Sequence, residues 1–78
     1  MPTIATEDGY RLKIYPNDHT PAHVHVQKAE SEARVRLDTL EVVSSEGFNS
    51  RELNRVVELV EKYQDALLSA WDSYHENR

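Results

Sequence analysis

Cysteine is absent from this 78-residue sequence, and glycine and proline are scarce, with two and three residues. Without cysteine there is neither a disulfide bond nor a thiolate metal site, so we expect a cytoplasmic protein. No apolar run approaches the roughly 20 residues of a membrane helix, and the N-terminus lacks the basic-then-apolar pattern of a signal peptide. A glycine-rich phosphate loop, an HExxH motif and a catalytic serine or cysteine motif are also missing, which excludes the hydrolase families that depend on them.

Acidic side chains outnumber basic ones. The chain has 14 acidic and nine basic residues, a formal net charge of −5, and 38% hydrophobic residues. This composition is that of a globular protein, and the length suits one domain, which we expect to span residues 1–78. A negative total argues against a protein coated in nucleic acid unless the basic residues are segregated on one face.

The first half of the chain predicts a β-sheet, because hydrophobic residues alternate from Ile4 to about Val43. Glu7-Asp8-Gly9 indicates a tight hairpin turn. The expected strands lie near residues 3–6, 10–15, 23–28 and 33–37, with residues 40–43 forming either a last strand or the approach to a helix. We therefore predict an α+β fold, in which an antiparallel meander of three to five strands (about residues 3–43) precedes a C-terminal helix (about residues 50–75) packed on one sheet face.

The second half repeats its apolar residues every three to four positions, as an amphipathic helix does. Asn49 suits the N-cap, and Glu52 falls at the N3 position of a capping box. We expect one helix or two nearly continuous ones, with a kink or break near residues 62–65. The predicted apolar stripe contains Leu53, Val56, Val57, Val60, Tyr63, Gln64, Leu67, Leu68, Trp71 and Tyr74.

Such a helix is long for so small a domain. Twenty-six residues span about 39 Å, which exceeds what a sheet of short strands covers. We therefore expect the end that carries Leu67, Trp71 and Tyr74 to contact another chain, since aromatic residues dominate binding hot spots. The expected partner is a second copy, giving a dimer, or a small cognate protein.

Strand alternation predicts that the sheet face turned away from the helix is basic. This predicted basic face consists of Arg11, Lys13, Tyr15, His23, His25, Arg34 and Arg36. One interpretation is a solvent-exposed face without a binding function, because antiparallel sheets commonly expose one side to water. Its functional interpretation is a surface that binds RNA, with Arg11, Lys13, Tyr15, Arg34 and Arg36 holding the substrate.

Three of the four histidines lie within seven residues, in an HxxxHxH pattern at His19, His23 and His25. On a strand, His23 and His25 project from the same face. They suit a zinc or other transition-metal site with His19 or Asp18 as a third ligand. Alternatively, they act as a catalytic general base and general acid in metal-independent RNA cleavage, without a cofactor. Structural or partner-binding histidines are the third interpretation, and His75, near the C-terminus, is expected to be exposed.

The chain also resembles a known family over nearly its whole length. The matching segments are Met1-Pro2-Thr3-Ile4, Gly9-Tyr10-Arg11, Asn17-Asp18-His19-Thr20-Pro21-Ala22-His23-Val24-His25-Val26, Gly47-Phe48-Asn49, Arg51-Glu52-Leu53, Leu68 and Ala70-Trp71. They resemble the small bacterial family called domain of unknown function 4160, in which the His-Val-His-Val segment is the most distinctive part. The sequence departs at Ala22, where the family often has a second proline, and in the turn at Ala29 and Ser31, where it favours glycine.

The resemblance implies a short prokaryotic protein that is often encoded beside another small domain of unknown function, number 2442. That arrangement is similar to a toxin–antitoxin pair. Three hypotheses follow: a toxin–antitoxin-type module that acts on RNA through His23 and His25, a metal-binding protein, and an interaction module without chemistry. The first is favoured on the gene pairing and the segregated charges.

Overall fold

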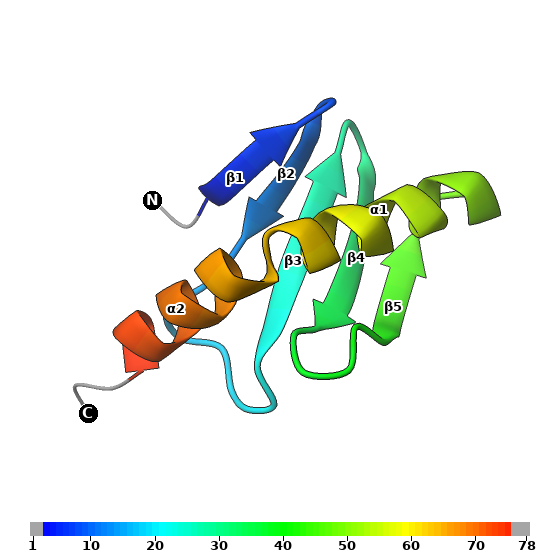
Figure 1. Cartoon of the computed structure of the whole chain (residues 1–78). Coiled ribbons are helices and arrows are strands. Elements are labelled where there is room, and N and C mark those ends of the chain that lie inside the picture. The colour runs from blue at the N-terminus through cyan, green and yellow to red at the C-terminus, as the bar shows by residue number, and fades with distance from the viewer. Residues whose placement is uncertain (1–2, 76–78) are drawn as a thin grey trace.

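The computed structural model describes residues 3–75. Five antiparallel strands form one sheet in the order β1-β2-β3-β4-β5, so each strand pairs with the next along the chain (Figure 1). The strands are β1 (Thr3–Glu7), β2 (Tyr10–Lys13), β3 (His23–Lys28), β4 (Ser31–Arg36) and β5 (Val42–Glu46). The predicted α+β meander is confirmed. Residues 1–2 and 76–78 of the expected domain lie outside the described residues.

Four of the predicted strands differ at their boundaries. The first ends at Glu7 instead of residue 6, and the fourth runs from Ser31 to Arg36 instead of from 33 to 37. The second strand ends at Lys13, two residues early, because Tyr15 already accepts a turn hydrogen bond from the amide of Asp18 at 3.2 Å. The last strand begins at Val42 and continues to Glu46, beyond the predicted limit of residue 43. Leu40 has a φ of 64°, which turns the chain before that strand can begin. The predicted hairpin turn is present, with positive φ at Gly9 and, in addition, at Asp8.

The helical half consists of α1 (Ser50–Lys62) and α2 (Gln64–His75), interrupted at Tyr63 within the predicted window. Asn49 caps α1: its side chain accepts from the amide of Glu52 at 2.8 Å, and the Glu52 carboxylate accepts from the amide of Asn49 at 2.9 Å. This reciprocal pair is the predicted capping box.

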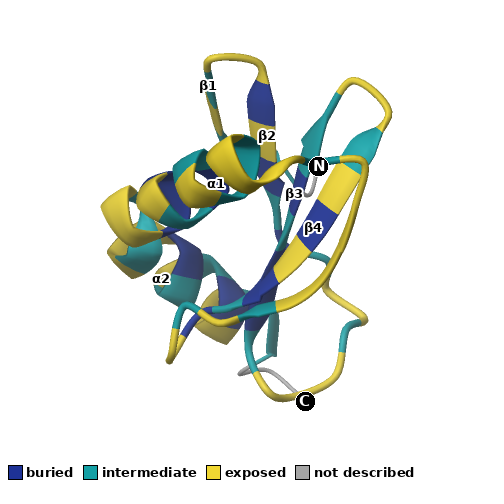
Figure 2. Cartoon of the chain, turned by 90° about the vertical axis from the view of Figure 1, so that its right-hand side faces the viewer, coloured by how far each residue is buried: buried dark blue, intermediate teal, exposed yellow. Residues whose placement is uncertain are grey.

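Both helices pack on one face of the sheet, and the core lies between these two layers (Figure 2). The predicted inward-facing strand residues, Leu12, Ile14, Val24, Val26, Val35 and Leu37, are all fully buried. Leu59 is fully buried as well, although the predicted stripe omitted it. It lies three residues after Val56, on the face that α1 turns to the sheet.

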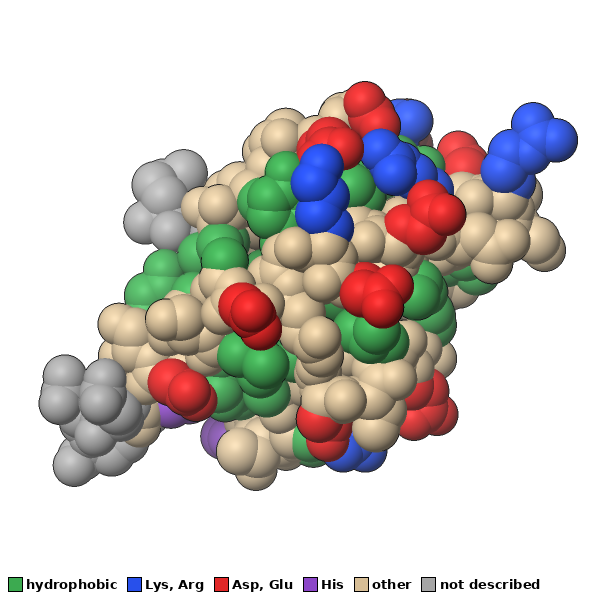
Figure 3. All heavy atoms as spheres, in the orientation of Figure 1, with side chains coloured by type: hydrophobic (Ala, Val, Ile, Leu, Met, Phe, Trp, Pro, Cys, Tyr) green, Lys and Arg blue, Asp and Glu red, His purple; other side chains and the backbone are tan. Residues whose placement is uncertain are grey.

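Charged groups hold α1 and the residue after it on the first hairpin. Glu7 accepts hydrogen bonds from Lys62 Nζ and from the Tyr63 hydroxyl, both at 2.7 Å, and Arg55 lies 3.1 Å away. The hydrogen bond from Lys62, followed by that from Tyr63, holds the pKa of Glu7 below its ordinary value. Figure 3 shows acidic side chains spread over this helix-covered side, whereas the basic ones lie mainly over α1, among acidic neighbours.

The three residues of α2 that we expected to contact another chain are less exposed than the length of the helical segment suggested. Leu67 and Trp71 are buried within the chain itself, and Tyr74 is half-buried against the same core. In Figure 1, α2 continues nearly in line with α1 past the strands, beside the loop between β2 and β3, and Trp71 packs there against His23 at the start of β3. Contact with a partner through this end therefore stays a prediction, and two of its three residues already serve the chain's own packing.

Among residues 3–75, neither helix has the length and apolar character needed to cross a membrane.

Candidate metal centre

The loop between β2 and β3 brings Asp18 to one end of the sheet. Its backbone is held there by α2, because Nε2 of His75 lies 2.9 Å from the carbonyl oxygen of Asp18. The expectation that His75 is solvent-exposed was wrong: it is half-buried, and its ring stacks on Trp71 with a centroid separation of 4.1 Å. The helix end thus positions the loop that carries the carboxylate.

Strand β3 supplies two imidazoles at the same end. His25 pairs with Lys13 in β2, which is the last pair of those two strands, so His23 lies beyond the end of β2. Trp71 of α2 lies against His23, with ring centroids 5.3 Å apart. His23 is therefore only 9% exposed, although alternation places it on the face opposite the core.

Asp18 and the two histidines converge on one point. The same carboxylate oxygen, Oδ2 of Asp18, lies 2.9 Å from Nε2 of His25 and 3.1 Å from Nε2 of His23. One potential ligand atom from each residue lies within 4.8 Å of the other two. The sequence pattern predicted the two histidines, with His19 or Asp18 completing the set, and the structure brings Asp18 to them.

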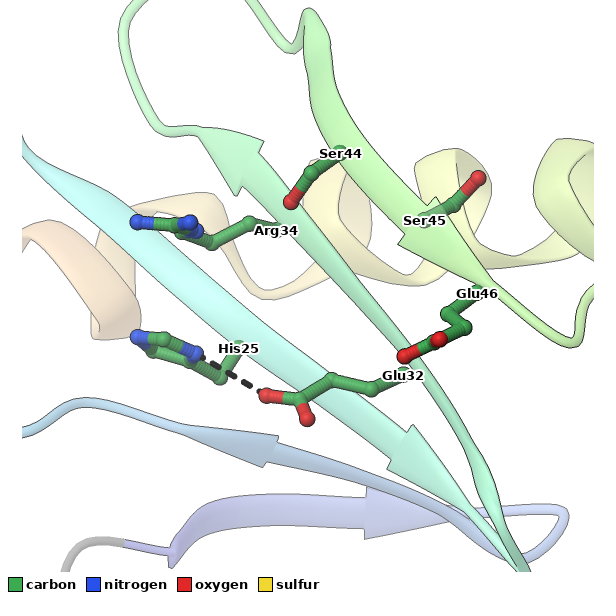
Figure 4. A pocket seen from close by; sticks show the side chains of 6 residues that line it. All are labelled: His25, Glu32, Arg34, Ser44, Ser45 and Glu46. Carbon is green, nitrogen blue, oxygen red and sulfur yellow. Dashed lines mark hydrogen bonds and ion pairs between the residues drawn. The ribbon is translucent and has the colours of Figure 1, made fainter.

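The other nitrogen of each ring is held by an acceptor. Nδ1 of His23 lies 2.9 Å from the carbonyl oxygen of Pro21, and Nδ1 of His25 lies 3.2 Å from Oε2 of Glu32 (Figure 4). A carbonyl and a carboxylate only accept hydrogen bonds, so both Nδ1 atoms carry the proton that is donated. Nε2 of His25 also forms a hydrogen bond with the Asp18 carboxylate at 2.9 Å, and it donates there only when both ring nitrogens are protonated. Once that proton has left, as metal binding requires, the Nε2 lone pairs of both rings are directed toward Asp18.

Nε2 of His23 is a buried nitrogen without a hydrogen-bond partner among the described residues. It lies 3.1 Å from Oδ2 of Asp18, which is close enough for an ion pair. The two groups are not aligned as a hydrogen bond requires. The contact therefore lacks a hydrogen bond, because hydrogen bonds weaken steeply away from linearity. A buried polar atom without a hydrogen bond lowers the stability of the fold. His23 is the member of the cluster that has such an atom.

The predicted basic face is only partly free. Arg11 and Arg34 are exposed, whereas Lys13 donates to Gln27 at 2.7 Å. Arg36 forms a two-pronged pair with Asp38, at 2.9 and 2.6 Å. The pair raises the pKa of Arg36 and lowers that of Asp38, in both cases chiefly through the side-chain hydrogen bonds.

The remaining predicted residues border the cluster. Tyr15 lies edge-on to His25, with centroids 4.7 Å apart. His19 is exposed and lies outside the three-residue cluster. It lines a hollow of about 280 Å³ together with Asp18, Thr20, Pro21, His23, Arg34, Arg36 and Val43.

A second hollow, of about 310 Å³, lies along β3, β4 and β5 (Figure 4). Its lining consists of His25, Glu32, Arg34, Ser44, Ser45 and Glu46. Arg34 borders both hollows and occupies the position on β4 directly opposite His25.

Two contributors to the site were not predicted: Glu32, which holds His25, and His75, which holds the Asp18 loop. Alternation could have revealed Glu32, because it lies two residues before Arg34 and therefore on the same sheet face. His75 gives no such signal, because its contact with Asp18 joins residues 57 positions apart across two layers.

A comparison with known families matches residues 9–72 to the family described as "Domain of unknown function (DUF4160)". The match covers strands β2 to β5, the histidine cluster, α1 and most of α2. No curated protein and no solved structure matches the chain.

Proposed function

The chain belongs to the domain of unknown function 4160 family, and we propose that it binds a divalent transition-metal ion through Asp18, His23 and His25. The observation that carries this proposal is the convergence of two Nε2 atoms on one carboxylate oxygen, with both Nδ1 atoms held from behind. Zinc is the ion that best suits two imidazoles and one carboxylate.

The spacing of the three side chains fits such an ion. Zinc bonds of about 2.0–2.1 Å in a tetrahedron place neighbouring ligand atoms about 3.3 Å apart. Two of the three distances between ligand atoms are close to that value, because the Nε2 atoms of His25 and His23 lie 2.9 and 3.1 Å from Oδ2 of Asp18. All three atoms lie within 4.8 Å of one another.

The contacts behind the rings fit a metal site as well. Metal-bound histidines almost always donate their other N–H to a carboxylate, a backbone carbonyl or water. His25 has the carboxylate of Glu32 in that place, and His23 has the carbonyl of Pro21. An ion would also give the unpartnered Nε2 of His23 a bond in place of its unfavourable contact with Asp18.

Three protein ligands leave at least one position of a four-coordinate ion for water or a ligand. That pattern is typical of a catalytic or exchangeable site, whereas a structural zinc site has four protein ligands. The open position would face the hollow that Asp18 and His23 line.

Zinc titration of chelator-treated protein by calorimetry tests the proposal. We expect wild type to bind one zinc ion. His25→Gln should lose more than the roughly 10–100-fold in affinity that removal of an outer partner costs. His19→Gln is the matched control, because it removes an exposed histidine outside the cluster and should bind like wild type. Absence of zinc binding by folded wild type, or equal losses in both variants, would contradict the proposed ligands.

RNA cleavage in a toxin–antitoxin-type module is the second candidate, and one observation favours it. The rings of His23 and His25 lie 5.2 Å apart, close enough to divide general acid and general base roles. We rank RNA cleavage below metal binding because His23 is buried, and a catalytic acid or base must reach its substrate. RNA cleavage that persists in excess chelator and disappears in His25→Gln would favour this candidate instead.

A further inference from the structure

Arg34 is a cation without a counterion in the part of the chain that the structure describes. Arg36 is paired with Asp38, Arg55 with Glu7, and Lys62 with Glu7. No hydrogen bond or ion pair within residues 3–75 involves the side chain of Arg34, which is exposed. Its guanidinium therefore keeps all five donors available for a ligand.

The position of Arg34 connects it to the proposed metal site. It lies directly opposite His25 in the β3–β4 register, and the two side chains extend in the same direction from neighbouring strands (Figure 4). It also lines one hollow together with Asp18 and His23, so a ligand in that hollow reaches both the guanidinium and the metal ligands. An ion there would offset the negative charge of Asp18, leaving the hollow positive overall.

We propose that this hollow binds the phosphoryl group of a phosphate ester, with one oxygen on the metal ion and others on Arg34. The proposal rests on the metal site above and names the class of ligand that the site takes. A guanidinium fork binds two oxygens side by side. A carboxylate has only two oxygens, so it cannot fill the fork and still offer one to the metal, whereas a phosphoryl group has enough oxygens for both.

Val43 indicates that the ligand is a phosphate ester and not inorganic phosphate. It is the one large hydrophobic side chain that is strongly exposed among residues 3–75, at 54%, and it lines this same hollow. When Arg34 and the metal ion bind the phosphoryl group, the apolar side chain beside them can contact the organic part of the same ligand. The hollow, at about 280 Å³, is slightly below the usual range for small-molecule sites, so it suits a small ester or one nucleotide unit of a longer chain.

Cobalt-loaded protein provides the test, because uptake of Co²⁺ and binding of phosphate are measured separately on one sample. Visible absorption reports uptake, and ³¹P line broadening reports inorganic phosphate or phenyl phosphate beside the paramagnetic ion. We expect Arg34→Gln to keep Co²⁺ uptake and to weaken phosphate binding by about 10-fold or more, the scale of a charged hydrogen bond. Arg11→Gln removes the same charge from the same sheet face and should bind phosphate like wild type.

Phenyl phosphate should bind wild type more tightly than inorganic phosphate, and Val43→Ser should reduce that advantage. Displacement of phenyl phosphate by a short single-stranded RNA would identify a phosphodiester as the source of the phosphoryl group. Displacement by glycerol phosphate but not by RNA would identify a small ester. Wild type that takes up Co²⁺ without broadening phosphate, or equal losses in Arg34→Gln and Arg11→Gln, would overturn this inference alone. Failure of folded wild type to take up Co²⁺ would overturn the metal proposal as well.

Discussion

Replacement of Glu32 by alanine separates a metal site from an ordinary surface ion pair. Glu32 accepts from Nδ1 of His25 at 3.2 Å, and its side chain is 48% exposed. An exposed ion pair contributes roughly 0–1 kcal/mol to folding, so Glu32→Ala should leave the free energy of unfolding nearly unchanged. If His25 binds metal, the same change removes the outer partner that orients its ring, which typically costs about 10–100-fold in affinity. That loss corresponds to about 1.4–2.7 kcal/mol of binding free energy.

Glu46→Ala is the matched control for this experiment. Glu46 lies directly opposite Glu32 in the β4–β5 register and lines the same hollow, and no contact joins it to His25 among the described residues. Both variants remove one negative charge from the lining of the same hollow, so the control accounts for the long-range effect of losing a charge there. Zinc affinity is measured by competition with a chromophoric chelator, and stability by denaturant unfolding of the metal-free proteins. Equal zinc affinities of Glu32→Ala and Glu46→Ala would refute the positioning role of Glu32.

Three further predictions concern the fold. Leu59→Ala should lower the free energy of unfolding by about 2–5 kcal/mol in denaturant titrations, because it empties part of the fully buried core. Asn49→Ala should cost about 0.5–2 kcal/mol by the same measurement, since it removes the cap that binds the Glu52 amide. Wild type should lose stability as the pH falls below the ordinary glutamate range near about 4.3, because Lys62 depresses the folded-state pKa of Glu7 and protonation then favours the unfolded chain. Thermal melts of Glu7→Gln should show a smaller loss over that range, and an identical loss would contradict this assignment.

Most of the fold could be predicted from local patterns. Alternation identified the inward residues of the strands, and Asn49 with Glu52 fixed the start of α1. The helix break was expected only within a window, because neither glycine nor proline marks it, and Tyr63 at its centre is held by Glu7 from the first hairpin. The late start of β5 depends on a positive φ at Leu40, a residue type that gives no sign of this conformation.

Only the part of the candidate site that lies on a single strand could be predicted from the sequence. Period-two spacing placed His23 and His25 together, but the choice between Asp18 and His19 depends on how the loop folds. The burial of His23 depends on Trp71, 48 positions later in the chain, which packs against it only after α2 docks on the sheet. Sequence patterns therefore identified the residue types of the candidate site, whereas tertiary packing decides which of them converge.

The central claim is that Asp18, His23 and His25 together bind one metal ion. X-ray absorption at the zinc edge of zinc-loaded protein tests it most directly, because the spectrum reports the atoms bonded to the ion. The account predicts two imidazole nitrogens and at least one oxygen at about 2.0–2.2 Å, and one imidazole fewer in His25→Gln. A wild-type spectrum with oxygen ligands alone, or one that His25→Gln leaves unchanged, would contradict it.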